Sequence, residues 1–260
     1  MKKKLLTATL LTLTAIVLVV STVLITIAYL TASSGVSNVF TVGNVSITMF
    51  ETKVDADGKP VTPYQEVDAN SYHLIPNTTY TKDPTIRITS LLEQDEMYLF
   101  VKSSNQIRKA EDGNNGGSKQ TMRQQMEANG WVEYVMSGDG VEIVWVYGTR
   151  DTATGVITPK AVNPTTVQTR GDGEKGKPGE IRLCEEFTIH KDANVSLYGA
   201  ASVNFTAFAI QTAGLDGVKP AWDGIKESYP YDCGIVNPVN PYDNTKDPYA
   251  PVPGTVVTNP

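Results

Sequence analysis

The chain has 260 residues, of which 40% are hydrophobic, and its 28 Asp and Glu outnumber its 22 Lys and Arg. This length is enough for one domain of ordinary size with tails at its ends. The net charge of −6 argues against a nucleic-acid partner, because the phosphate backbone repels an acidic surface. The composition leaves enzymes, binding modules and structural proteins as the classes to be separated.

The N-terminus has the pattern of an export signal. Lysines at positions 2 to 4 precede Leu5–Leu30, a stretch without a charged residue. A basic start, an apolar middle and a small-x-small exit are typical of a signal peptide, and Thr26 and Ala28 form such an exit. We expect residues 1–28 to be removed, so that Tyr29 begins the mature chain. The alternative is a retained anchor, since the stretch is long enough to span a bilayer.

Both alternatives place the rest of the chain outside the cytoplasm, because the positive end stays inside. The sequence therefore predicts a secreted or cell-surface protein that contacts the membrane only through its N-terminal segment before cleavage. We expect residues 29–229 to fold. Residues 230–260 are rich in Pro, Asn and Asp, which is typical of a flexible tail.

Between these ends the dominant hydrophobic period is two, which predicts β-strands. The predicted strands are Asn44–Phe50, Thr85–Thr89, Glu96–Ser104, Gly140–Gly148, Glu180–His190 and Ser202–Gln211. Segments rich in Gly, Asn, Asp and Pro separate them and predict turns. Many strands with turn punctuation favour an all-β fold, an antiparallel sandwich or barrel.

Two short helices are expected in the connections. Ser118–Gly130 contains good helix formers and ends on glycine, a common C-terminal residue of helices. Lys219–Tyr229 has Pro220 near its start, where proline is tolerated because the first helical N–H groups need no partner within the helix.

Residues with chemical potential are few. Cys184 and Cys233 are the only cysteines; outside the cytosol they would either form a disulfide or stay two unrelated thiols. His73 and His190 are the only histidines, and no His-Glu-x-x-His, Gly-x-Ser-x-Gly or phosphate-binding glycine loop occurs. The sequence predicts no catalytic site, no metal site and no cofactor. Residues 170–172 spell Arg-Gly-Asp, which supports a surface adhesin as an alternative.

Four segments, taken in order, resemble bacterial TasA and camelysin proteins. They are AYLTASSGVSNVFTVGNVSITMFE from Ala28, HLIPNTTYTKDPTIRI from His73, MYLFVKSS from Met97 and FTAFAIQTAGLDGVKPAWD from Phe205. The sequence departs from the family pattern at Asn77, where the family often has Gly, in a Gly/Asn-rich insert near residues 113–117, and in its Pro-rich tail.

The resemblance implies a jelly-roll sandwich that is processed by a SipW-type signal peptidase and assembles into biofilm-matrix fibres. The resemblance also implies that the mature N-terminal segment of one subunit completes the sheet of the next copy in the fibre. The corresponding arm here is residues 29–41. The side chains that would fill the acceptor groove are those of Val36, Val39, Phe40 and Val42. Main-chain hydrogen bonds would give the affinity and alternate side chains the register.

Two alternatives accompany this hypothesis. The N-terminal segment can instead be only the first strand of its own domain. Camelysin members have also been assigned casein-cleaving metalloprotease activity, so an enzyme is the rival class, although the sequence contains no recognisable set of zinc ligands.

Overall fold

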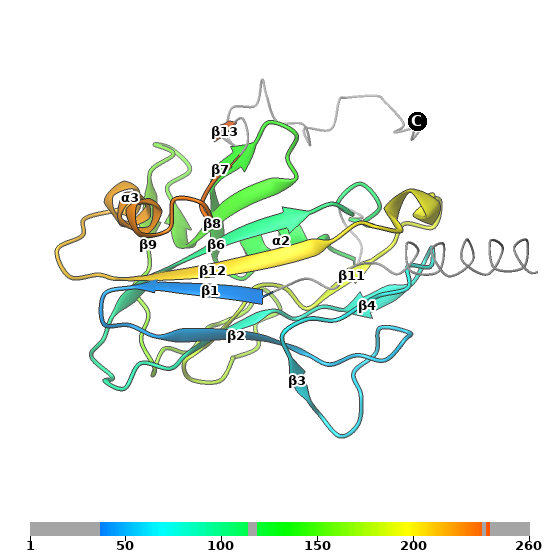
Figure 1. The fold of residues 1–260 in the computed structure, drawn as a ribbon, viewed down its shortest axis with the longest axis horizontal. Helices are drawn as coiled ribbons and strands as arrows, with labels where there is room; N and C mark the ends of the chain where they lie inside the picture. The colour runs from blue at the N-terminus through cyan, green and yellow to red at the C-terminus, as the bar shows by residue number, and fades with distance from the viewer. Residues whose placement is uncertain (1–36, 114–118, 236–237, 240–260) are drawn as a thin grey trace, which may run out of the picture.

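The computed structural model describes residues 37–113, 119–235 and 238–239 (Figure 1). The predicted cleavage residues Thr26, Ala28 and Tyr29, the apolar N-terminal segment and Val36 lie outside these ranges. None of the helices in the described ranges is long and apolar enough to cross a bilayer.

The strands form one large sheet, one smaller sheet and a two-stranded ribbon. The larger sheet has the order β1 (Ser37–Val42), β12 (Val203–Gln211), β6 (Met97–Asn105), β8 (Glu142–Arg150), β7 (Trp131–Ser137) and β13 (Pro238–Val239), and β9 (Ile157–Pro159) also pairs with β8. The smaller sheet has the order β10 (Glu180–Arg182), β5 (Thr85–Ile88), β2 (Ile47–Thr52) and β3 (Glu66–Val67). The ribbon pairs β11 (Glu186–Thr188) with β4 (Thr79–Thr81).

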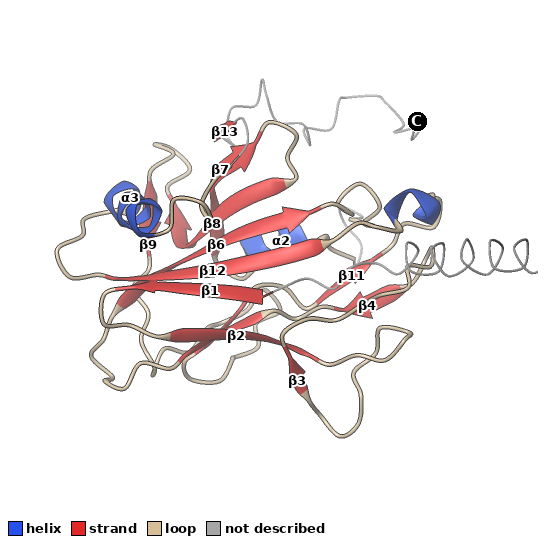
Figure 2. Cartoon of the chain, in the orientation of Figure 1, coloured by secondary structure: helices blue, strands red, loops and turns tan. Residues whose placement is uncertain are grey.

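Side chains alternate across the larger sheet, so each of its faces meets a different hydrophobic cluster. Leu99 and Trp145 point inward, into a cluster that also contains Ile86 of the smaller sheet. Phe100 points outward, into a second cluster that contains Trp222 of α3 (Val218–Ser228). The molecule is therefore a β-sandwich with a helix on the outer face of one sheet, and the predicted all-β sandwich class is confirmed (Figure 2).

The two predicted helices are present with shifted ends. α2 (Met122–Ala128) begins at a capping box, in which the Thr121 side chain accepts the N–H of Gln124 and the Gln124 side chain accepts the N–H of Thr121. It turns Met122 and Met126 into the interior. α3 covers nearly the whole of the predicted range, and a one-turn 3₁₀ helix, η1 (Val195–Tyr198), lies before β12.

The predicted strand Glu180–His190 is two strands in the structure. β10 pairs with β5, whereas β11 pairs with β4. The change of partner occurs opposite Pro84, which lies between β4 and β5 and has no N–H with which to continue a ladder. Leu183 and Cys184 are consecutive and both fully buried, so the chain bends instead of alternating there.

Candidate strand-exchange site

β1 is an edge strand that pairs only with β12 (Figure 1). Among the strand pairs described, this pair alone is parallel, and its register aligns Val39 with Ala207 and Phe40 with Phe208. Parallel pairing is slightly less stable per residue than antiparallel pairing. The described part of the predicted arm, residues 37–41, therefore belongs to β1 and lies at the edge of its own sheet, paired with one strand only.

Phe40 attaches β1 to the outer-face cluster. Its ring stacks on Phe208 with centroids 5.3 Å apart and packs at a tilt on Tyr229, 4.7 Å away. The Tyr229 hydroxyl, just beyond α3, donates a hydrogen bond of 2.6 Å to the carbonyl of Thr41. Val42 is partly buried against the same cluster. β12 and the end of α3 thus form the surface on which β1 packs.

Two of the four residues predicted to fill an acceptor groove, Phe40 and Val42, pack on this surface. Val39 points to the opposite face of the strand and is 36% exposed, as expected from the alternation of side chains along a strand. Val36 lies outside the described residues. Tyr229 was not predicted, because its contact with β1 joins segments that are distant in the sequence.

A turn at Gly43 connects β1 to β2 of the smaller sheet. Gly43 has a φ of +90°, a conformation that other residues rarely adopt. A Cβ atom placed on it would lie only 2.9 Å from the Cβ of Gln211, and the Gln211 side chain accepts a long hydrogen bond from the Asn44 N–H. The position of β1 beside β12 therefore depends on a turn that specifically suits glycine.

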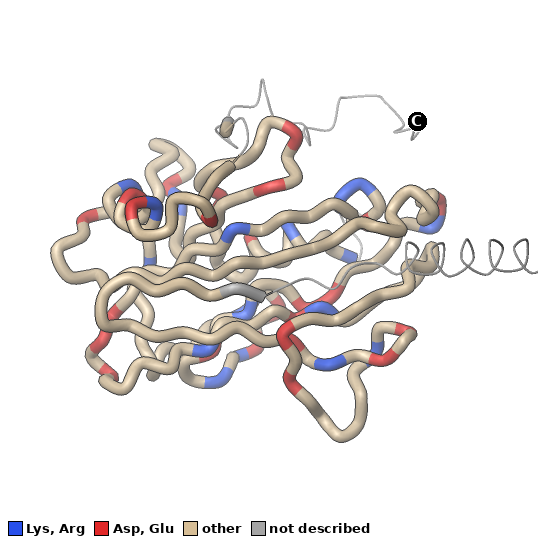
Figure 3. Tube along the Cα trace, viewed as in Figure 1, with Lys and Arg blue, Asp and Glu red and all other residues tan. Residues whose placement is uncertain are grey.

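The ribbon formed by β1 and β12 carries no charged side chain. Both strands contain only apolar and neutral polar residues and no glycine. The chain trace shows no Lys, Arg, Asp or Glu along β12 (Figure 3). Natural sheet edges are commonly protected from pairing with other molecules by charges or proline. The uncharged edge of β12 is covered by β1 instead.

Cys184 and Cys233, the predicted candidates for a disulfide, are both free and buried. Cys184 lies in the inner-face cluster and Cys233 in the outer-face cluster, so the larger sheet separates them. A disulfide requires Cα atoms within about 7 Å, and the bridge is not formed. Burial raises the pKa of the Cys233 thiol to about 11. The buried position of Cys233 also means that the folded part extends beyond residue 229.

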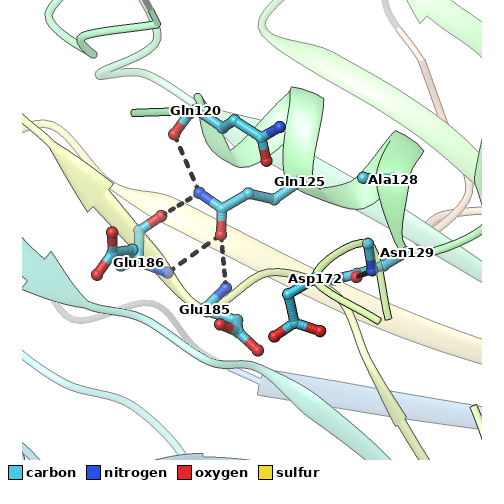
Figure 4. A pocket seen from close by; sticks show the side chains of 8 residues that line it. Gln120, Gln125, Ala128, Asn129, Asp172, Glu185 and Glu186 are labelled. Carbon is cyan, nitrogen blue, oxygen red and sulfur yellow. Dashed lines mark hydrogen bonds between the residues drawn. The ribbon is translucent and has the colours of Figure 1, made fainter. Parts of the chain in front are cut away.

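The Arg-Gly-Asp sequence is tied to the protein surface. Arg170 forms ion pairs with Asp172 at 3.4 Å and Glu185 at 3.1 Å. Asp172 lines a small pocket that Gln125 of α2 also lines (Figure 4). The Gln125 side chain accepts the N–H of Glu185 and donates to the carbonyl of Glu186 in β11. The pocket therefore lies where α2 is hydrogen-bonded to β11.

The two histidines do not meet. His73 is exposed, and His190 accepts the N–H of Asp192 with its Nδ1. Among residues 37–113, 119–235 and 238–239, no group of three or more His, Cys, Asp or Glu side chains is arranged to hold a metal ion.

Glu111 is a titratable group that sequence analysis did not single out. Its two carboxyl oxygens accept hydrogen bonds from Asn105 Nδ2 at 2.5 Å and from the Met122 N–H at 2.7 Å. Burial of the carboxyl raises its pKa to about 7, although both hydrogen bonds oppose the rise. The group links the end of β6 to the first turn of α2.

This position predicts a pH dependence of stability. The raised pKa means that the folded state binds more protons than the unfolded state between pH 4.5 and about 7. The contribution of Glu111 is therefore complete below the lower value and is lost as the pH rises through the higher one. Urea unfolding at about pH 5 and about pH 8 should show a smaller loss of stability in Glu111→Gln than in the unchanged protein. Glu174→Gln, at an exposed loop position, is the matched control and should follow the unchanged protein.

Comparisons of the chain with protein-family models, with curated proteins and with solved structures gave no match. The resemblance to TasA and camelysin proteins accordingly stays a prediction that rests on the four segments quoted above. The structural features that bear on function are the β1 edge and the turn at Gly43.

Proposed function

We propose that the chain is an exported structural subunit that assembles with copies of itself into an extracellular fibre by donating β1 to the next copy. The observation that carries this proposal is the state of β1: an uncharged edge strand, held by one parallel ladder and connected through a turn at Gly43. Departure of β1 would expose an unpaired β12 edge and the ring of Phe208. An incoming β1 strand from another copy would pair with the β12 edge and cover the ring of Phe208.

The resemblance to TasA and camelysin proteins supports the same function. Asn77, which stands where that family often has Gly, has a φ of +58°, so the backbone there has the conformation that favours glycine. β1 also lies within a few residues of the predicted cleavage site. A SipW-type signal peptidase would free the arm only after export, which would delay assembly until the chain is outside the cell.

The free energy of exchange depends on few terms. A donated β1 makes the same contacts with a neighbour's β12 as it makes with its own, so the contacts cancel between the closed and the exchanged states. The difference that remains is the free energy of the turn at Gly43, set against the entropy lost on association. Protein concentration and the turn at Gly43 therefore decide whether β1 pairs with its own β12 or with the β12 of a neighbouring copy.

A disulfide between β1 and β12 tests the exchange directly. Val39 and Ala207 are ladder partners, and adjacent strands lie about 4.8 Å apart, within the range that a disulfide spans. The secreted, processed Val39→Cys/Ala207→Cys variant is oxidised either before or after assembly. Oxidation before assembly should link β1 to β12 of the same chain. Electron microscopy should then show no filaments until reductant is added. Oxidation after assembly should instead produce a ladder of covalent multimers on non-reducing gels.

The matched controls are the unchanged protein, which retains buried Cys184 and Cys233, and the single Val39→Cys variant. Neither should give a ladder. Filaments that form equally well from the pre-oxidised double variant would contradict strand donation, as would assembled protein that cross-links only within single chains.

A further inference from the structure

Two ionisable side chains occupy core positions of the sandwich. Along β2 the inward-facing residues are Ile47, Met49 and Glu51, and the inward positions around β4 are Tyr80 and Lys82. Lys82 Nζ lies 2.5 Å from Glu51 Oε1, and the two side chains are only 2% and 5% exposed. Both interrupt a hydrophobic pattern at positions where an apolar residue would be expected.

Asn70 completes the group. Its Nδ2 lies 3.2 Å from Oε2 of Glu51 and also donates to the Thr52 carbonyl at 2.8 Å. Its Oδ1 accepts the N–H of Val54 at 2.9 Å. The Glu51 carboxylate thus contacts an amine through one oxygen and a carboxamide through the other. Asn70 itself is 5% exposed.

The surroundings are apolar and aromatic. Lys82 Nζ lies 5.8 Å from the ring centroid of Tyr72 and 5.6 Å from that of Phe205. A buried ion pair contributes little net stability, because desolvation of the two charges offsets their attraction. Glu51 holds the Lys82 amine on one carboxyl oxygen and the Asn70 carboxamide on the other, so a nucleophile and an acyl group share one acid–base partner.

We propose that Lys82 and Asn70 join in an intramolecular isopeptide bond, with Glu51 as the catalytic acid and base. The bond formed is Lys82 Nζ to Asn70 Cγ, and the bond broken is Asn70 Cγ to Nδ2. One ammonia molecule leaves. The primary carboxamide becomes a secondary amide, so no oxidant, metal or cofactor is required.

The contacts assign a role to each atom. Oε1 of Glu51 takes a proton from Lys82 Nζ, and the amine attacks Cγ of Asn70. Negative charge develops on Oδ1 of Asn70, where the Val54 N–H already donates a hydrogen bond and stabilises it. Glu51 passes that proton from Oε2 to Nδ2, the leaving nitrogen, whose second contact is the Thr52 carbonyl. The second proton lost from Nζ leaves with the ammonia, as ammonium.

The product would close a covalent loop around residues 70–82, which contain β4. The pairing of β4 with β11 fixes this segment beside the inner-face cluster. The bond would be shielded from water and proteases, and it would hold the segment without the disulfide that the two separated cysteines do not form. The inference does not depend on the proposed strand exchange.

Mass spectrometry of the unchanged full-length chain, purified without unfolding, tests the proposal. The intact mass should be lower than the sequence mass by one ammonia. Trypsin cuts after Lys53 and not before Pro60, so an unlinked chain yields residues 54–82 and residues 83–87. A linked Lys82 resists trypsin, and residues 54–87 should appear as one peptide that lacks one ammonia.

Two variants define the chemistry. Lys82→Arg keeps a buried cation without a nucleophilic amine, and Glu51→Gln keeps the shape without the acid–base group; both should retain the full ammonia content of residues 54–87. A natively folded, unchanged protein that has its full sequence mass would overturn the proposal. So would loss of ammonia with normal cleavage after Lys82, because that combination indicates a succinimide at Asn70–Ser71 instead of a cross-link.

Discussion

Replacing Gly43 by Ala is expected to shift the protein from closed monomer towards assembly. Alanine at a φ of +90° is strained, and its Cβ would contact Gln211. We expect a cost of about 1–2 kcal/mol to the closed turn, which corresponds to about a 5- to 30-fold change in an equilibrium constant. A donated arm can cross to its neighbour through an extended connection, where alanine is not strained. The same change should therefore destabilise the monomer and lower the concentration at which filaments appear.

Gly214→Ala provides the matched control. Gly214 also has a positive φ, of 78°, but a Cβ there meets no atom within 4 Å, and it lies between β12 and α3. Its replacement should lower the free energy of unfolding by a similar strain without changing assembly. Light scattering over a concentration series, with urea unfolding of the monomer, separates the two effects. Equal critical concentrations for Gly43→Ala and Gly214→Ala would mean that residue 43 is not a hinge.

The fold class could be predicted because the signals are local. Period-two alternation located the cores of β5, β6, β8 and β12 to within a few residues, and the glycine after α2 located the end of that helix. β7 was missed: a register shift between Glu133 and Val135 breaks its pairing with β8 and interrupts the simple alternation. Strand ends that depend on a change of partner, as at Pro84, were also not predictable from the pattern.

The candidate sites divide in the same way. Phe40 and Val42 could be selected from the sequence because a strand-forming segment next to a cleavage signal is a local feature. The surface on which Phe40 packs could not be predicted, since it is made by Phe208 and Tyr229, which are far along the chain. Glu51, Asn70 and Lys82 carried no signal as a group. Each is a common surface residue type, and only the packing of β2 against the segment before β5 brings them together.

Replacing Lys82 by Met is expected to have the largest effect on stability. The change removes the amine that lies 2.5 Å from Glu51 and leaves a carboxylate in the core with only the Asn70 amide beside it. Removal of one partner of a buried ion pair typically costs about 3–5 kcal/mol. Urea or thermal unfolding should show this loss, whereas Lys177→Met at an exposed position should show almost none. A loss below about 1 kcal/mol for Lys82→Met would contradict the structural burial of the pair.

The double variant Lys82→Met/Glu51→Leu then distinguishes an ion pair from a covalent bond. Two apolar side chains of similar volume remove both charges, and such replacements of buried pairs are often neutral or stabilising. If the unchanged protein holds only an ion pair, the double variant should recover most of the stability that the single variant lost. If residues 70 and 82 are covalently linked, the double variant should stay less stable by roughly 3 kcal/mol, because loss of the cross-link frees a loop of the unfolded chain. Near-complete recovery would count against the isopeptide bond, and a persistent deficit in a folded double variant would support it.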